Sequence, residues 1–210
     1  GHFVNRADTA GFVPSSIMGA QYVDLDLDGD QDVVLGSGSH PLPTMQPVFF
    51  YRNDGDHQFT NITPMDDVKF YGKFHGMAFA DYDHDGDPDF YLNNGGVLLS
   101  DRFRDLFLEN TTEGQHWLHI KLEGTESNRE GVGTRIAVEV GDRTLYQHRT
   151  AGQGFSSTNT PYMIFGLGSA DATGEITLRW PSGTVQTLPP MAADQAIIVT
   201  EGSEELRRVY

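Results

Sequence analysis

Two short aspartate-rich segments are the part of the sequence best suited to chemistry. They carry carboxylates at every second position: Asp24, Asp26, Asp28, Asp30 and Asp32 in the first, and Asp81, Asp83, Asp85, Asp87 and Asp89 in the second. Carboxylates this close together repel one another unless a cation lies between them. A hard cation that takes roughly six to eight oxygen ligands suits such a set, which favours Ca²⁺ over the smaller Mg²⁺. We therefore predict two calcium sites, one in each segment.

The residues within and after each segment indicate the type of calcium loop. Gly29 and Gly86 occupy the sixth position, where a sharp turn requires a residue without a Cβ atom. The side chains at positions one, three, five and nine then converge on one ion, and the seventh residue offers its backbone carbonyl. An EF-hand has a bidentate Glu at position twelve and then a helix, whereas position twelve here is Leu35 or Leu92 in a run that favours a strand. The segments are therefore predicted to be loop-to-strand sites.

The elements that position these loops come from an internal repeat. Phe3 corresponds to Phe59 and Asp24 to Asp81, an offset of 56 to 57 residues. Each copy contains short β-branched or aromatic runs bounded by Gly, Asn and Asp, which is typical of a small antiparallel β unit. The first part of the chain is thus predicted to be two β repeats resembling propeller blades.

The second half also has the pattern of an all-β domain. Within Thr134–Val140, apolar and polar residues alternate, so one face of that strand packs and the other meets solvent. A β-sandwich is the simplest arrangement for several such strands, and a short helix is expected only at Ser100–Glu109. The expected strands are Trp117–Leu122, Thr134–Val140, Thr144–Thr150, Glu175–Trp180, Thr184–Leu188 and Ala196–Glu201.

Composition excludes several classes of function. The chain has 210 residues, no cysteine, and 30 acidic against 14 basic side chains, which gives a formal net charge of −16. That charge repels phosphate backbones, so nucleic acid binding is not expected. No apolar run approaches the roughly 18 residues needed to span a bilayer, so membrane insertion is not expected either. Without cysteine, the chain has no disulfides, thiolate nucleophiles or Cys-ligated zinc.

The histidines do not form an evident metal or catalytic site. His116 and His119 are three apart, and residues three apart on a strand face opposite sides. We expect His116 to point inward with Leu118 and Ile120, and His119 to lie on the surface. The two cannot then share one ion.

If the chain is an enzyme, its best candidate cluster is Tyr146, His148, Arg149 and Arg135. A Tyr or His base beside a cationic Arg suits proton abstraction next to a carboxylate or carbonyl. However, Tyr146 and His148 share one strand face while Arg149 faces the other, and exposed strand faces commonly carry such polar mixtures. No Gly-x-Ser-x-Gly elbow or dinucleotide motif is present. These absences favour a protein without catalytic residues.

The same motifs bring a family resemblance into view. Asp-x-Asp-x-Asp-Gly-x-x-Asp resembles the FG-GAP/VCBS repeat of integrin-type and bacterial surface β-propellers. The second half is similar to the ASPIC/UnbV domain at His116-Trp117-Leu118, Ser127–Gly133, Gly152–Phe155, Phe165–Gly168, Trp180–Gly183 and Asp194-Gln195. The chain therefore resembles the cartilage acidic protein-like family, in which FG-GAP/VCBS repeats precede an ASPIC/UnbV domain. Relatives carry enough repeats to close a propeller, whereas this chain has two.

The resemblance implies a division into repeats at residues 1–113, about 1–57 and 58–113, and a UnbV-like domain at 114–210. It also implies a secreted, cell-surface or periplasmic module that binds two Ca²⁺ and presents a rigid β surface to a protein or glycan. No signal peptide is visible after Gly1. The exposed edges of two blades predict packing on the UnbV-like domain, with self-association through repeat edges as a second contribution.

An enzyme is the alternative: a lyase, isomerase or cyclase acting on a carbohydrate or natural product. A deep pocket lined by His, Tyr and Arg from both halves would favour the enzyme, whereas a flat surface would favour a binding module.

Overall fold

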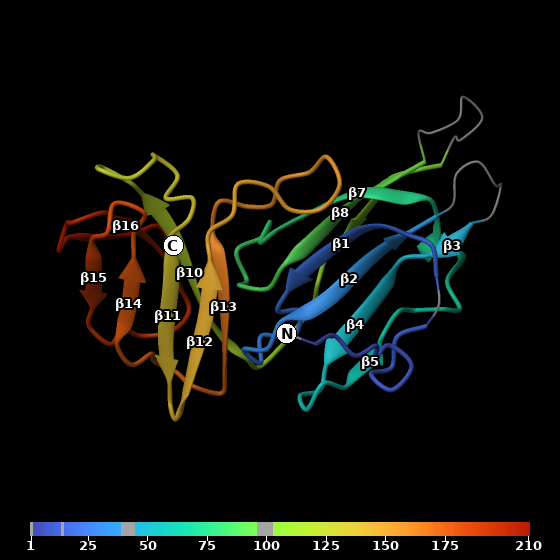
Figure 1. Ribbon diagram of the computed structural model, residues 1–210, viewed down its shortest axis with the longest axis horizontal. Helices are drawn as coiled ribbons and strands as arrows, with labels where there is room; N and C mark the ends of the chain where they lie inside the picture. Colours follow the sequence, from blue (N-terminus) through green and yellow to red (C-terminus); the bar gives the residue numbers. More distant parts are fainter. Residues whose placement is uncertain (1, 14, 39–44, 96–102) are drawn as a thin grey trace.

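The computed structural model describes residues 2–13, 15–38, 45–95 and 103–210, and its regular structure is almost entirely β. Small antiparallel sheets in a propeller-like arrangement form the N-terminal region, and a two-sheet unit forms the C-terminal region (Figure 1). This confirms the predicted all-β fold. No helix within the described ranges is long and apolar enough to cross a membrane.

The first repeat forms a four-stranded antiparallel sheet in the order β1-β2-β4-β5. Its strands are β1 (Ile17–Val23), β2 (Asp32–Ser37), β4 (Phe49–Asn53) and β5 (Phe59–Asn61). The first aspartate segment is the connection between β1 and β2. A separate two-stranded ladder pairs β3 (Gln46–Pro47) with β6 (Tyr71–Gly72), which follows the 3₁₀ turn η1 (Val68–Phe70).

The second repeat forms the sheet β7-β8-β9, and the second aspartate segment joins its first two strands. These strands are β7 (Phe74–Ala80), β8 (Asp89–Asn94) and β9 (Leu106–Leu108). The helix expected at Ser100–Glu109 is wrong where it can be tested, because Leu106–Leu108 pairs with β8 as a strand. Residues 100–102 lie outside the described residues. Cross-strand pairing with Phe90–Leu92 therefore overrides the weak helical pattern.

The two repeats share one hydrophobic core. The ring of Phe90 packs at 5.7 Å from that of Phe50 and at 5.8 Å from that of Phe79, so rings from both copies interlock. Pooling the aromatic residues lets each sheet bury a face that a lone three- or four-stranded sheet would leave in water. The buried members of this core are Val23, Leu25, Val34, Val48, Phe74, Met77, Phe90 and Leu92.

The C-terminal region is a β-sandwich of two four-stranded sheets, as predicted. One sheet has the order β13-β10-β16-β17 and the other β12-β11-β14-β15. The strands are β10 (His116–Glu123), β11 (Arg135–Val140), β12 (Arg143–His148), β13 (Met163–Gly168), β14 (Ile176–Arg179), β15 (Val185–Leu188), β16 (Gln195–Thr200) and β17 (Leu206–Arg208). All six strands expected here are present with bounds shifted by one or two residues, and β13 and β17 were not anticipated.

Strand β10 is covered on both faces, and this reverses the prediction for its histidines. Leu118 and Ile120 fill the core between the two sheets, while Trp117 and His119 point the other way, toward the repeats. His119 is completely buried, and His116 is half-buried at a β-bulge, where its Nδ1 lies 2.8 Å from a carboxylate oxygen of Asp194. Side chains alternate as predicted from Trp117 to Ile120, whereas the bulge takes His116 out of this pattern. His119 is buried because the outer face of this sheet lies against another part of the chain instead of solvent.

Candidate metal centres and the adjoining cleft

The two aspartate loops share two left-handed backbone positions. Position four has a left-handed backbone in both, with φ of 57° at Leu27 and 69° at His84. Position six does too, with φ of 94° at Gly29 and 107° at Gly86. A residue other than glycine rarely adopts a positive φ without strain. Because positive φ angles occur at positions four and six in both loops, the two copies of the repeat share this loop geometry.

In each loop, three carboxylates come within bonding reach of one ion. One oxygen each from Asp24, Asp26 and Asp28 lie within 4.8 Å of one another in the first loop. In the second loop the set is Asp81, Asp83 and Asp89, so its third member is the residue at position nine instead of position five. The second cluster is the more open, because its member Asp83 is exposed, whereas no member of the first cluster is.

The ninth residue of each loop braces the turn. Asp32 accepts hydrogen bonds from the N–H of Leu25 and of Asn53, both at 2.6 Å. Asp89 accepts equivalent bonds from Tyr82 at 2.8 Å and Asn110 at 2.9 Å. Each oxygen keeps a second lone pair, so this residue can position the loop and still face an ion.

The fifth residue has the same kind of partner in both loops, whereas the seventh residue does not. Asp28 and Asp85 each accept a hydrogen bond from the backbone N–H two residues later. The carboxylate of Asp30 forms a 2.6 Å ion pair with Arg143 of the sandwich through one of its oxygens. Asp87 instead accepts the N–H of Thr112 with one oxygen and buries the other.

The electrostatics of these loops are unfavourable without a cation. Burial, together with the neighbouring carboxylates of Asp28 and Asp32, raises the pKa of Asp24 to about 8 despite a hydrogen bond from the N–H of Gly29. Burial likewise raises the pKa of Asp32 to about 7, despite the two N–H groups that it accepts. Burial also raises the pKa of Asp87 to about 7.

Several loop oxygens have no hydrogen bond partner. Asp24 Oδ1, Asp26 Oδ1 and Asp87 Oδ1 are buried and accept no hydrogen bond from any residue that the structure describes. A buried carboxylate oxygen left unpaired costs free energy unless a cation or water completes it. The donor set is all oxygen, which suits Ca²⁺. The residues present therefore fit a calcium ion in each loop.

The first loop also contacts the sandwich. The N–H of Gly168 donates to the carbonyl of Leu27 at 2.8 Å, and a Cβ atom at Gly166 would lie 2.3 Å from Asp24 Oδ2. Arg143 reaches both the carbonyl of Asp28 and the carboxylate of Asp30. Strand β13 therefore lies directly on the loop.

The second loop supports the neighbouring strand β10. His119 Nε2 lies 3.0 Å from the carbonyl of Gly86, and a Cβ atom at Gly86 would lie 2.0 Å from Trp117 Nε1. Burial lowers the pKa of His119 to about 4, so this imidazole is neutral and donates to the loop carbonyl at physiological pH. Tyr210 packs beside His84 and donates a long hydrogen bond of 3.4 Å to Asp81. Both loops thus contact the sandwich directly.

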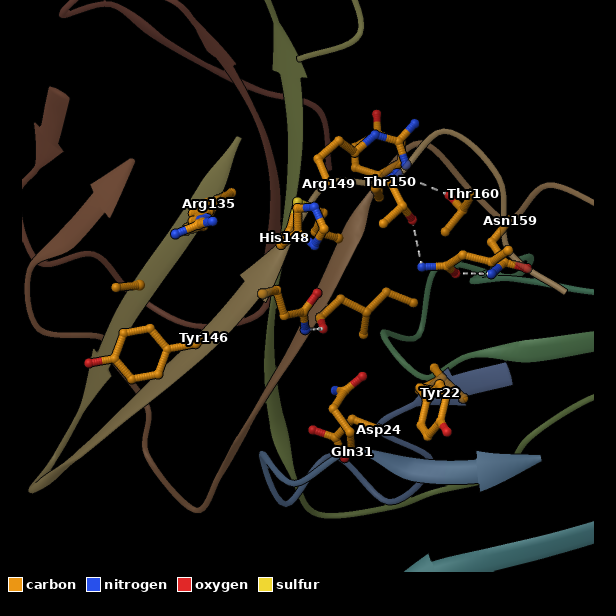
Figure 2. Close-up of a pocket in the computed structure, with 18 of the residues that line it drawn as sticks. Tyr22, Asp24, Gln31, Arg135, Tyr146, His148, Arg149, Thr150, Asn159 and Thr160 are labelled. Atoms are coloured by element: carbon orange, nitrogen blue, oxygen red, sulfur yellow. Dashed lines mark hydrogen bonds between the residues drawn. The ribbon is translucent and has the colours of Figure 1, made fainter. Parts of the chain in front are cut away.

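A cleft of about 800 Å³ lies beside this junction, between the first repeat and strands β11 and β12. It brings together all four residues proposed as the candidate catalytic cluster, and it adds Arg179 and Gln153, which the sequence analysis did not propose as site residues. Figure 2 shows Arg135, Tyr146, His148 and Arg149 on the sandwich side and Tyr22, Asp24 and Gln31 on the repeat side.

Comparisons with known proteins find a separate family match in each half of the chain. Residues 2–92 match the family model described as FG-GAP-like repeat, and residues 124–206 match the model described as ASPIC and UnbV. FG-GAP repeats are typical of extracellular or cell-surface proteins, and the two matches together indicate an extracellular-type β-repeat interaction module. A search of curated proteins found no match.

Proposed function

Because the chain consists of an FG-GAP-like repeat region followed by an ASPIC/UnbV domain, we propose that it is a calcium-dependent extracellular binding module. One Ca²⁺ in each aspartate loop would rigidify the repeats and fix the sandwich on them. The assembled surface would then bind a protein or glycan partner.

The unpaired, buried carboxylate oxygens carry this proposal. Asp24 and Asp26 in the first loop and Asp87 in the second each bury an oxygen without a described partner. An interior carboxylate normally accepts hydrogen bonds or binds a cation, and a cluster of three normally does not ionise fully without one. Each loop thus contains at least one unpaired, buried carboxylate oxygen. The two loops also share positive φ angles at positions four and six and hydrogen bonds to the carboxylate of the ninth residue.

Calcium would act through the loop backbone as well as through charge. The carbonyls of Leu27 and Gly86 both contact the sandwich, and each belongs to a loop whose carboxylates repel. Neutralising that repulsion would hold the carbonyls where Gly168 and His119 meet them. The physical consequence is that metal binding and domain docking stabilise each other.

Metal analysis of single-loop variants tests the proposal. Asp26→Asn and Asp83→Asn keep the side-chain shape but remove a charged ligand, and each should lower bound calcium from two ions to one per chain. Asp142→Asn, in the exposed turn between β11 and β12, is the matched control and should retain two. Two ions in either loop variant would show that the ligands are assigned wrongly, and no calcium in the wild-type protein would refute the proposal.

An enzyme is a second candidate because the cleft gathers a Tyr, a His and two Arg side chains beside residues of the repeats. Tyr146 or His148 would remove a proton that Arg135 or Arg149 makes more acidic by binding the neighbouring carboxylate. Elimination from an acidic polysaccharide then breaks the glycosidic carbon–oxygen bond next to the deprotonated carbon, and the leaving oxygen takes up a proton from solvent to become a sugar hydroxyl. The carbon–carbon double bond that forms is followed by its ultraviolet absorbance. An increase in absorbance that Tyr146→Phe and His148→Gln abolish would support the enzyme. Binding of the polysaccharide without any increase in absorbance would support only the binding module.

A further inference from the structure

We propose that the cleft between the first repeat and the sandwich binds an acidic sugar, with its anionic group on a row of basic side chains and its ring against a tyrosine. The inference deepens the proposed function, because it rests on that module and names what the module binds. The cleft volume of about 800 Å³ is in the range of small-molecule sites and accommodates a small saccharide or the end of a longer one.

The basic row follows from strand register. Arg135 on β11 lies directly opposite His148 on β12 and Arg179 on β14, so the three side chains cross one sheet face side by side. All three are exposed and line the cleft, and Arg149 lines it from the end of β12. The cleft therefore gathers three of the chain's 14 lysine and arginine residues.

These arginines have no acidic partner among the described residues. The ion pairs of the described part of the chain involve other basic side chains, including Arg143 with Asp30 and Arg207 with Glu123. Like charges directly opposite each other destabilise a sheet, as Arg135 and Arg179 must do here. An anion placed between them would remove this repulsion and accept charge-assisted hydrogen bonds from both guanidinium groups.

Tyrosines give the cleft its second property. Tyr146 is 76 % exposed and Tyr22 is 63 % exposed, and they stand on opposite sides, one on the sandwich and one on the first repeat (Figure 2). An exposed tyrosine offers a flat apolar face and a hydroxyl, a combination that suits a partly apolar and partly hydrogen-bonding ligand such as a sugar ring. Tyr146 lies two positions along the sheet from the basic row, on the same face, and pairs with the small residue Ala137.

The wall above the cleft is held in place by hydrogen bonds to the repeat. This wall is the segment that joins β12 to β13 and arches toward the repeats in Figure 1. Asn159 donates to Gln21 at 3.0 Å and also contacts Gln153, and Thr160 donates its N–H to the carbonyl of Phe79 at 2.9 Å. Gln21 is itself buried and donates to the carbonyl of Met77 at 2.8 Å. A wall fixed before binding lowers the entropy cost of association.

Acidic residues at the margins limit where an anion can lie. Glu139 and Glu175 line the cleft beyond Thr177 on the sandwich face, and Asp24 lines it on the repeat side. An anionic group would be repelled from both margins and attracted to the row formed by Arg135, Arg179 and His148. The sugar ring would then extend from that row toward Tyr146.

Isothermal titration calorimetry on the calcium-loaded full chain provides the test, with digalacturonate as the carboxylated probe, a sulfated galactose disaccharide as the sulfated probe and digalactose as the neutral one. We expect the acidic probes to bind and the neutral probe to bind at least tenfold more weakly, a difference of ~1.4 kcal/mol. Binding should weaken as ionic strength rises. Binding of only one acidic probe would identify the anionic group as carboxylate or sulfate.

Matched variants make the site assignment falsifiable. Arg135→Gln and Arg179→Gln should each weaken acidic-probe binding about tenfold, because each removes one charge-assisted contact. Arg129→Gln changes charge equally on an exposed loop outside the cleft and should have no effect. Tyr146→Ala should weaken binding, whereas Phe107→Ala, which truncates an exposed ring on β9, should not.

The outcomes separate this inference from the proposed function. Calcium content and far-ultraviolet circular dichroism are measured on the same samples. Failure of both acidic probes to bind a folded chain with two calcium ions would overturn the acidic-sugar site and leave the calcium-dependent module standing. Equal binding of the neutral probe, or equal losses in Arg129→Gln and Arg135→Gln, would also overturn it.

Discussion

The contact between the second aspartate loop and Trp117 makes a quantitative prediction. Gly86 has φ of 107°, and an added Cβ atom would lie 2.0 Å from Trp117 Nε1. Trp117 cannot move aside easily, because it is 6 % exposed and packs with Leu27, Ile164 and Ala196. In Gly86→Ala, the left-handed backbone costs about 1–2 kcal/mol. Overpacking against the indole adds about 1–3 kcal/mol.

Gly183 provides a control for the backbone part of this cost. Its φ is 96°, close to that of Gly86, but a Cβ atom there would meet nothing within 4 Å. Gly183→Ala should therefore lose only the backbone contribution of about 1–2 kcal/mol. In a chain of this size the extra ~1–3 kcal/mol in Gly86→Ala corresponds to a melting temperature lower by roughly 2–12 °C.

Urea denaturation at saturating calcium measures both free energies, and a double-mutant cycle with Trp117→Ala identifies the clash. If the indole is the obstacle, Gly86→Ala should cost no more than Gly183→Ala once Trp117 has been truncated. Equal losses for the two glycine variants in the wild-type background would refute the docking of the second loop on β10.

Three further predictions follow from the same structure. Chelating calcium with EDTA should lower the melting temperature, because each ion bound only by the folded state contributes about 2.7 kcal/mol at a hundredfold excess over its Kd; an unchanged value after verified metal removal would contradict this. Glu201→Gln should lower stability by about 1–2 kcal/mol. Although burial alone would raise the pKa of this carboxyl, hydrogen bonds from Ser182, Ser127 and Thr125 lower it to about 2 from 4.5, so the stabilisation should be complete above pH 4.5 and be lost as pH falls toward 2. Limited proteolysis should leave the region around Gly114 intact while calcium is bound, and light scattering should show whether the repeat edges add self-association. Rapid cleavage into two monomeric, folded pieces would contradict docking of the sandwich on the repeats.

Local sequence signals predicted the loops and most strands for definite physical reasons. The alternating aspartates, the glycine at position six and the apolar run after each loop act over a dozen residues, so Asp24 to Leu35 could be interpreted without knowing the rest of the fold. The alternation of apolar and polar residues in β11 likewise predicts one buried and one solvent-facing side. Strand β13 was missed because Met163–Gly168 is buried throughout except at its last residue, and a short apolar run without alternation has no clear period.

Features that depend on contact between distant segments could not be predicted in the same way. His119 was expected on the surface because nothing near it in sequence shows that the carbonyl of Gly86 would lie 3.0 Å from its ring. Tyr22 was not identified as a cleft residue, because it lies across the cleft from Tyr146 only after the sandwich docks on the first repeat. The register that sets Arg135 opposite Arg179 depends on a strand pairing across about 40 residues of chain.

The position of the loops links the metal proposal to the sugar-binding proposal. One side of the cleft belongs to the first repeat and the other to the sandwich, so its width depends on how the two are docked. That docking rests on loop groups, namely the carbonyls of Leu27 and Gly86 and the carboxylate of Asp30. A cation that relieves repulsion within the loops would therefore also fix the distance between Tyr22 and the row of basic side chains. If both proposals hold, calcium should increase affinity for an acidic sugar without touching it, and by linkage the sugar should increase affinity for calcium by the same factor.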